Sequence, residues 1–319
     1  MNVADYISDT SGKDYYIVSR EDLVSIADVI RDTAGVENSF TFPTQYESVV
    51  ETFSPGGGEK FNELVSKTIS GPIQYSSQNI GAHSFRNCTQ ITSFSAPIAT
   101  TIGIHSFDGC TKLTTVDLPE VTEWGIGAND GGTFAGCSKL TSVTMPKVTS
   151  ITYKAFDGCT SLTDYSTFGD NVTQLWNWAF SGTKIQSAVF KNVTYLGDRA
   201  FNGCTSLTIA SFPLVTTLRG TTFYGCTTLQ YAIFSSVTAM GAQEFQNCSN
   251  CTLVLANKDA VCTCSNVNSL SSLQAVYVPN SLLSDYKAAT NFSSVESKIY
   301  AIEDSQTILD LLDTYGYDY

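Results

Sequence analysis

The chain has 319 residues, 42% of them hydrophobic, and a formal net charge of −13. This apolar content is sufficient for a folded core and argues against a disordered chain. The acidic excess lies near the two ends and no basic cluster is present, so neither nucleic acid nor an anionic membrane surface is expected as a partner.

The N-terminal residues 1–60 predict a small helical docking module that ends in a Gly-rich linker. The first residues, MNVADYISDTSGK, lack the basic and apolar segments of a secretory signal. A first helix is expected after the capping pair Ser19 and Asp22, and a second after Pro43. Two short helices are too small to be stable alone, so we expect residues 16–55 to dock on another subunit.

A repeated unit follows this module. Its marker is a Phe that recurs every 21 to 27 residues, at Phe85, Phe107, Phe134, Phe156, Phe180, Phe201, Phe223 and Phe245. In every copy except that of Phe180, a Cys stands three residues further on. A catalytic centre is normally built once, whereas a structural unit can be copied. We therefore interpret these thiols as packing residues of a stacked core.

Each copy contains one short strand. In the second copy, the spacing of Leu113, Val116 and Leu118 predicts a strand that alternates between two faces. Pro119 then ends the strand. A unit with one strand cannot bury its apolar face alone, so the copies are expected to stack on one another.

This pattern resembles the BspA-like leucine-rich repeats, whose consensus is A-F-x-x-C-x-x-L-x-x-V-x-L-P-x-x-V-x-x-I. The resemblance covers residues 61–257 and implies an α/β fold: a right-handed solenoid with a parallel β-sheet on its concave side. Departures from the consensus are local, because only Phe168, Lys191 and Ser235 stand where Pro is expected and the Phe180 copy lacks its Cys.

The strand residues between the inward positions are candidates for binding. They are expected to point to the concave face, which is small and polar early in the chain and more apolar late. The candidates are Thr115, Asp117, Ser142, Thr144, Asp164, Ser166 and Tyr231. A shallow face suits a large polymer or a protein better than a small molecule. The alternative is that these side chains are merely solvated.

Two irregular segments add further candidates. The insertion at residues 125–132 is a Gly-rich loop that must project from the stacked units, and it offers Asn129 and Asp130. Trp176 and Trp178 lie two residues apart, so one would face inward and the other would be an exposed platform for a sugar ring. The alternative is that both Trp side chains fill a gap between irregular units.

Two sets of residues raise the question of a metal. His83 and His105 each precede a repeat Phe by two residues, so we expect them one above the other, as a surface ladder or as metal ligands. A second set is formed by Cys248, Cys251, Cys262 and Cys264. Its C-x-x-C and C-x-C spacings could suit zinc, but its first member already belongs to the repeat. We favour packing over ligation and predict no metal, no cofactor and no catalytic constellation.

The C-terminal residues 258–319 are expected to form a cap with an acidic tail. Residues 275–304 are similar to the ending that closes BspA-like solenoids, which implies a strand, a helix near residues 281–289 and a second strand. The helix residues expected to face inward are Leu282, Leu283 and Tyr286. An open solenoid end needs such a cover.

The N-terminal segment resembles a short module of virion and tail-fibre proteins from phages that infect gut Firmicutes. The matching residues are Asp22, Leu23, Ile26, Ala27, Ile30, Arg31, Thr41, Phe42 and Pro43. The resemblance implies a phage virion protein, made in the host cytoplasm, that contacts other virion subunits through residues 16–55. Its solenoid would be displayed for receptor binding to a host-surface protein or glycan, with a homo-oligomer as one option.

Two alternatives to the virion protein stay open. One is a bacterial BspA-like surface adhesin located at the cell surface. The other is an enzyme that uses the solenoid as a binding arm. The sequence offers no catalytic residues for the second, so we predict adhesion without enzymatic activity.

Overall fold

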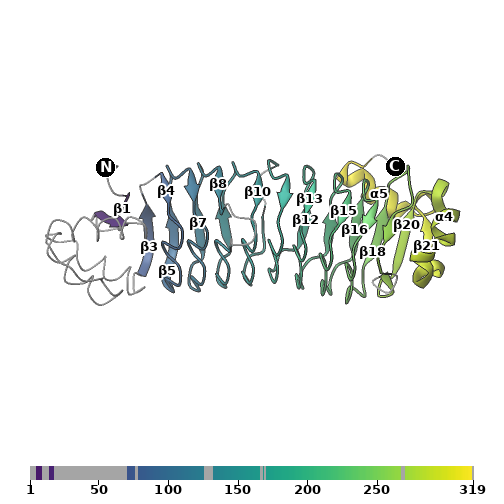
Figure 1. Ribbon diagram of the computed structural model, residues 1–319, viewed down its shortest axis with the longest axis horizontal. Coiled ribbons are helices and arrows are strands. Elements are labelled where there is room, and N and C mark those ends of the chain that lie inside the picture. The colour runs from purple at the N-terminus through teal and green to yellow at the C-terminus, as the bar shows by residue number, and fades with distance from the viewer. Residues whose placement is uncertain are drawn as a thin grey trace, which may run out of the picture.

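A computed structural model describes residues 5–8, 14–17, 70–75, 78–125, 132–165, 168, 170–266 and 270–317. The chain forms a parallel β solenoid whose turns stand side by side along one long axis, with helices at the C-terminal end (Figure 1). Within these residues, no helix has the length and apolar character needed to cross a membrane.

One side of the solenoid, the main face, consists of two six-stranded sheets. The N-terminal main sheet contains, in spatial order, β2 (Asp14–Ile17), β1 (Asp5–Ser8), β3 (Ser70–Tyr75), β5 (Gln90–Ser95), β7 (Thr115–Asp117) and β9 (Ser142–Thr144). The C-terminal main sheet contains β12 (Ser187–Val189), β14 (Ile209–Ser211), β16 (Tyr231–Phe234), β18 (Thr252–Leu255), β20 (Ala275–Val278) and β21 (Ile299–Ala301). The predicted solenoid with a parallel sheet is thereby confirmed.

A second face is built from three short three-stranded sheets. The first contains β4 (Asn79–Ile80), β6 (Thr101–Ile102) and β8 (Glu123–Trp124). The next contains β10 (Ser150–Ile151), β11 (Gln174–Leu175) and β13 (Tyr195–Leu196). The last contains β15 (Thr217–Leu218), β17 (Ala239–Met240) and β19 (Thr263–Cys264). Each regular turn therefore contributes one strand to the main face and one shorter strand to the second face.

The N-terminal end contains two strands that the prediction of a helical module did not include. β1 pairs antiparallel with β2 and also with β3, so a hairpin extends the edge of the first main sheet. Local sequence patterns indicated no strand in this region. The helices predicted within residues 16–55 lie outside the described residues, apart from the end of β2.

A column of stacked Phe rings runs through the interior. The repeat Phe residues are fully buried, and neighbouring rings lie nearly parallel with centroids between 5.1 and 5.6 Å apart. Each turn thus presents one aromatic ring to the turns before and after it. This repeated contact explains why the Phe is the most regular element of the sequence repeat.

The repeat cysteines form a second interior column. The Cys110 thiol donates a hydrogen bond to the carbonyl oxygen of Phe85 in the preceding turn, at 3.0 Å, and later copies make the equivalent contact. In the copy without a Cys, Thr183 takes the same position and lies 3.4 Å from the Cys204 sulfur. All ten cysteines are buried and none forms a disulfide, and burial raises the pKa of Cys248 to about 12. The structural interpretation of these thiols is confirmed.

Among the residues that the structure describes, no strand joins β9 to β12, so the main face is interrupted between them. The strand predicted at Asp164 and Ser166 does not form at Asp164, and Ser166 lies outside the described residues. Tyr165 stands three residues after Leu162, at the position where regular turns place the inward strand residue, such as Phe94, Val116 or Ala210. Its ring instead stacks on Phe190 of the following turn, with centroids 4.4 Å apart, and its hydroxyl contacts the Val189 backbone. The prediction of a strand at Asp164 was therefore wrong, and the Tyr165 side chain takes part in contacts with the next turn.

The C-terminal cap has the predicted order and one additional helix. It contains η3 (Asn280–Leu282), α4 (Leu283–Ala288), η4 (Thr290–Lys298), η5 (Ile302–Asp304) and α5 (Gln306–Tyr315). Tyr286 of α4 is fully buried and accepts a hydrogen bond from the Cys262 N–H at 2.9 Å, as expected for a residue that faces inward. Leu282 and Leu283 also pack against the core. Helix α5 lies in the segment that was expected to be an acidic tail.

Candidate binding site

The open part of the main face carries four of the predicted binding residues. Thr115 and Asp117 of β7 point outward and are exposed. They pair in register with Ser142 and Thr144 of β9, which are half-buried. The structure therefore brings these side chains together as two adjacent rows on one surface, next to the outward serines of β5.

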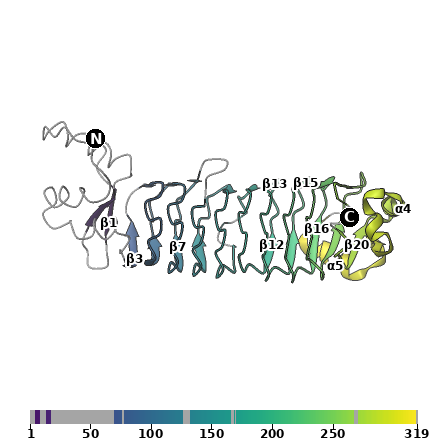
Figure 2. The same ribbon diagram turned by 60° about the horizontal axis from the view of Figure 1, so that its bottom comes forward.

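Helix α5 covers the apolar part of the same face (Figures 1 and 2). Ile308, Leu312 and Tyr317 pack on the outward side chains Ile233 and Val254, and all of them are buried. Gly316 ends the helix with a φ of 71°, a left-handed conformation that glycine adopts readily, and the chain then turns toward the sheet. The apolar C-terminal part of the main face is therefore covered by a helix of the same chain.

Tyr317 attaches the end of this segment to the sheet through polar contacts. Its hydroxyl donates a hydrogen bond to the carbonyl oxygen of Ile233, at 3.0 Å, and lies 2.7 Å from the Ser211 hydroxyl. The predicted binding residue Tyr231 is half-buried against the same cluster. Tyr231 therefore belongs to the surface that receives α5, and the open face lies on the N-terminal side of it.

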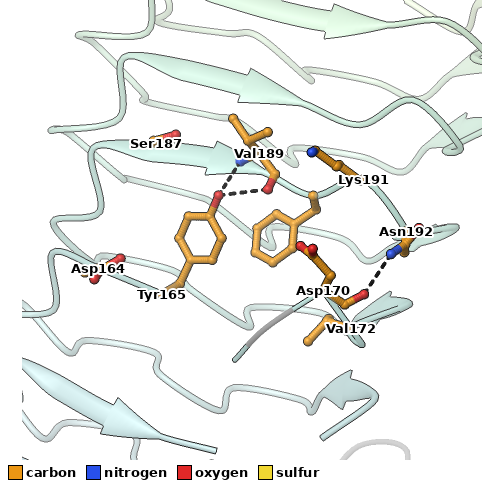
Figure 3. A pocket seen from close by; sticks show the side chains of 9 residues that line it. Asp164, Tyr165, Asp170, Val172, Ser187, Val189, Lys191 and Asn192 are labelled. Atoms are coloured by element: carbon orange, nitrogen blue, oxygen red, sulfur yellow. Dashed lines mark hydrogen bonds between the residues drawn. The ribbon is translucent and has the colours of Figure 1, made fainter. Parts of the chain in front are cut away.

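A pocket of about 500 Å³ occupies the interruption of the main face (Figure 3). It is lined by Asp164, Tyr165, Asp170, Val172, Ser187, Val189, Phe190, Lys191 and Asn192. The pocket lies between β9 and β12, where the described residues form no strand of the main face. Of its lining residues, only Asp164 was among the predicted binding residues.

Tyr165 closes the free edge of β12. Its hydroxyl accepts a hydrogen bond from the Val189 N–H at 2.6 Å and donates one to the Val189 carbonyl oxygen at 2.9 Å (Figure 3). These two backbone groups would otherwise lack the partner that a neighbouring strand supplies. Burial raises the pKa of the Tyr165 phenol, so it stays protonated and can donate.

The pocket combines an apolar floor with a polar rim. Val172 and Phe190 are almost fully buried beneath it, whereas Asp170, Lys191 and Asn192 are exposed. The Asn192 side chain donates a hydrogen bond to the Asp170 backbone carbonyl at 2.8 Å, which links the two rim segments. Two signals in the sequence point to this site: the 24-residue step between Phe156 and Phe180, and Lys191 in place of a Pro.

The two Trp residues do not form the predicted exposed platform. Both are half-buried. The Arg199 guanidinium lies over the Trp178 ring at 4.7 Å, and the Lys154 ammonium lies 5.7 Å from it. Because these cations come from the following and preceding turns, they approach Trp178 from opposite sides. Trp176 contacts the Tyr195 ring at 5.1 Å. These contacts favour the alternative in which the Trp side chains stabilise neighbouring turns.

The histidines stack as predicted, with ring centroids 5.2 Å apart. His105 Nδ1 also lies 3.3 Å from the Asp108 carboxylate. Among the residues that the structure places, no group of three or more His, Cys, Asp or Glu is arranged to hold a metal ion. The candidate loop residues Asn129 and Asp130 lie outside the described residues.

Glu244 is a buried acid in the last regular turn, and we predict that it makes stability depend on pH. Its carboxylate accepts hydrogen bonds from the backbone N–H groups of Thr222 and Gly241, at 3.0 and 3.2 Å. Burial nevertheless outweighs these contacts and raises its pKa from about 4.5 to about 8. The folded protein therefore binds this proton more tightly than the unfolded chain does. The resulting stability is complete below about pH 4.5 and is lost as the pH rises toward 8.

The variant Glu244→Gln should remove this dependence. Its free energy of unfolding relative to the parent should rise by up to about 1.4 kcal/mol per pH unit between pH 5 and 8. Urea unfolding of both proteins at pH 5, 6.5 and 8 measures the difference. A difference that stays constant over this range would contradict the assignment of a raised pKa to Glu244.

The sequence matches the family model described as "BspA type Leucine rich repeat region", in six copies, over residues 78–129 and 130–252. These two ranges together make up more than half of the chain. No curated protein matches the sequence.

Several solved structures resemble the chain in fold. The T. pallidum leucine rich repeat protein TpLRR aligns with a TM-score of 0.43 and 20% identity, over 56% of this chain and 83% of that one. A leucine rich cell surface protein from Faecalibacterium prausnitzii A2-165 aligns with a TM-score of 0.35 and 18% identity, over 75% and 92%. A leucine-rich repeat protein from Bacteroides ovatus ATCC 8483 gives a TM-score of 0.34 and 16% identity, over 74% and 85%.

Proposed function

The chain belongs to the BspA-type leucine-rich repeat family, and on this premise we propose that it is an attachment protein whose main face binds a protein or a glycan on a cell surface. The observation that carries the proposal is the division of that face. Its side chains are polar and open on β7 and β9, whereas the apolar strands β16 and β18 are covered by the chain's own helix.

The construction of the solenoid supports this role. The Phe and Cys columns hold the turns together from inside, so the outward residues of β7 and β9 do not contribute to the core. Such residues can be adapted to a ligand without loss of stability, and a row of them provides an extended contact surface. A long polymer or a protein surface matches this shape better than a small molecule does.

Two settings are compatible with an attachment protein. In the first, the chain is part of a phage virion, held to other virion subunits through residues 16–55, and the resemblance of residues 22–43 to phage modules favours it. In the second, the chain is a bacterial surface adhesin, which the repeat family fits equally well. Mass spectrometry of purified phage particles and of washed cell-surface fractions distinguishes the two, because the protein should be enriched in only one.

Direct binding to cells tests the proposed face. Fluorescently labelled protein should bind intact gut Firmicutes cells, and the double variant Asp117→Lys/Thr144→Trp should bind at least tenfold less. Both residues point outward on paired strands, so the substitutions should leave the melting temperature unchanged. The matched control is Glu123→Lys/Thr217→Trp on the second face, where both residues are exposed. Equal losses in the two variants would show that the main face is not the binding surface.

A further inference from the structure

We infer that the pocket beside Tyr165 binds one neutral sugar residue of a glycan, an inference that rests on the proposed attachment function. The pocket and the open rows of β9 belong to the same face, because β9 is the last strand before the interruption. A glycan that extends over Ser142 and Thr144 could therefore place one sugar ring in the pocket.

The pocket is stabilised in its open form. A turn that merely failed to form a strand would leave the edge of β12 with unpaired backbone groups, or the gap would close by packing. Here the Tyr165 hydroxyl satisfies both the N–H and the carbonyl of Val189, and the Tyr165 ring is held against Phe190. The cavity is thus preformed, which lowers the entropic cost of binding a ligand.

The size and lining of the pocket fit a sugar ring. A volume of about 500 Å³ lies within the range of small-ligand pockets, roughly 300–1,000 Å³. Val172, Phe190 and the Tyr165 ring offer apolar surface to the C–H groups of a sugar. The Asp170 carboxylate can accept hydrogen bonds from hydroxyl groups, and Asn192 can donate and accept them.

The charges of the lining select a neutral ligand. The carboxylates of Asp164 and Asp170 exceed the single ammonium group of Lys191, so an acidic sugar or a phosphate would be repelled. A basic peptide side chain would be attracted by the two carboxylates, but its ammonium group would lose hydration over the apolar floor of Val172 and Phe190. A neutral ring with several hydroxyl groups avoids both penalties.

Saturation-transfer NMR and calorimetry with the full-length protein test the inference. The probes are neutral oligosaccharides ending in glucose, galactose or an N-acetylhexosamine, with sialylated oligosaccharides and an oligolysine peptide as comparison ligands. At least one neutral oligosaccharide should bind, and the variant Asp170→Asn should weaken it roughly tenfold or more, because a hydrogen bond to a charged acceptor is lost. Ser187→Trp should fill the pocket and abolish binding. The matched control Thr217→Trp on the second face should bind normally.

The possible outcomes separate this inference from the proposed function. Binding of only sialylated ligands or only oligolysine overturns the neutral-sugar assignment, as does the absence of binding to every neutral probe at millimolar concentration. Circular dichroism is the control that checks whether the pocket variants are folded. If cell binding depends on Asp117 and Thr144 but is unaffected by Asp170→Asn and Ser187→Trp, the attachment function stands and the pocket inference fails. If none of these variants alters cell binding, the proposed face fails as well.

Discussion

Replacing Phe201 with alanine should lower the free energy of unfolding by about 3–5 kcal/mol, the range expected for loss of a buried aromatic ring. Phe201 is fully buried, and its ring lies between those of Phe180 and Phe223, with centroids 5.6 Å away on both sides. The cavity cannot close easily, because the hydrogen-bonded strands fix the spacing of adjacent turns. Chemical denaturation followed by circular dichroism measures the loss.

The variant Tyr300→Ala provides a matched control for this measurement. Tyr300 is 46% exposed, and its ring contacts the Tyr277 ring on the adjacent strand with centroids 5.6 Å apart. Removing this cross-strand contact should cost less than about 1 kcal/mol. Similar losses in the two variants would show that the Phe column does not form the stabilising core of the solenoid.

The stacked interior could be predicted from the sequence because the repeat encodes it directly. Equal spacing places equivalent residues above one another, which is why the Phe column and the stacked pair His83 and His105 were expected and are present. The inward position of Tyr286 in the cap was also predicted correctly. These features depend on the spacing of the repeated residues and on the stacking of the turns. The spacing can be read directly from the sequence, and the stacking follows from it.

The interruption of the main face was missed although the sequence contains a sign of it. The copy that begins at Phe156 is 24 residues long, and Tyr165 takes the position of the inward strand residue. The prediction extended the regular strand pattern over Asp164. Whether a strand forms there depends on contacts between neighbouring turns, such as those of Tyr165 with Val189 and Phe190, which a repeat consensus does not describe. The position of Asp170 and Asn192 at the rim of a pocket could not be anticipated for the same reason.

The two ends were predicted less well because their contacts are not local. β1 joins the sheet through pairing with β3, more than sixty residues later in the chain. Residues 306–315 contain Ile308, Leu309, Leu311 and Leu312, a helical pattern that the acidic composition of the tail obscured. The apolar outward residues Ile233 and Val254 also indicated such a helix, because an apolar strand face is normally covered by another element.

The variant Leu312→Ala tests the contribution of that cover and should lower the free energy of unfolding by about 2–5 kcal/mol, because Leu312 is fully buried. The matched control is Leu214→Ala. The Leu214 side chain is 46% exposed, so its removal should change the free energy of unfolding little.

Removal of residues 305–319 should have a broader effect than Leu312→Ala. It would expose Ile233 and Val254 on the sheet, so we expect increased binding of a hydrophobic dye and self-association in light scattering.

The same truncation distinguishes a cover from a regulatory lid. Strands β7 and β9 belong to the N-terminal main sheet, whereas α5 packs on β16 and β18 of the C-terminal main sheet. The truncated protein should therefore bind cells through β7 and β9 with unchanged affinity as long as it stays monomeric. A gain in cell binding would mean that α5 competes with the ligand for the apolar strands. Unchanged dye binding and a monomeric truncated protein would mean that the apolar strands do not depend on α5 for protection from water. The expected combination, lower stability with unchanged cell binding, assigns α5 to the core and the polar strands to recognition.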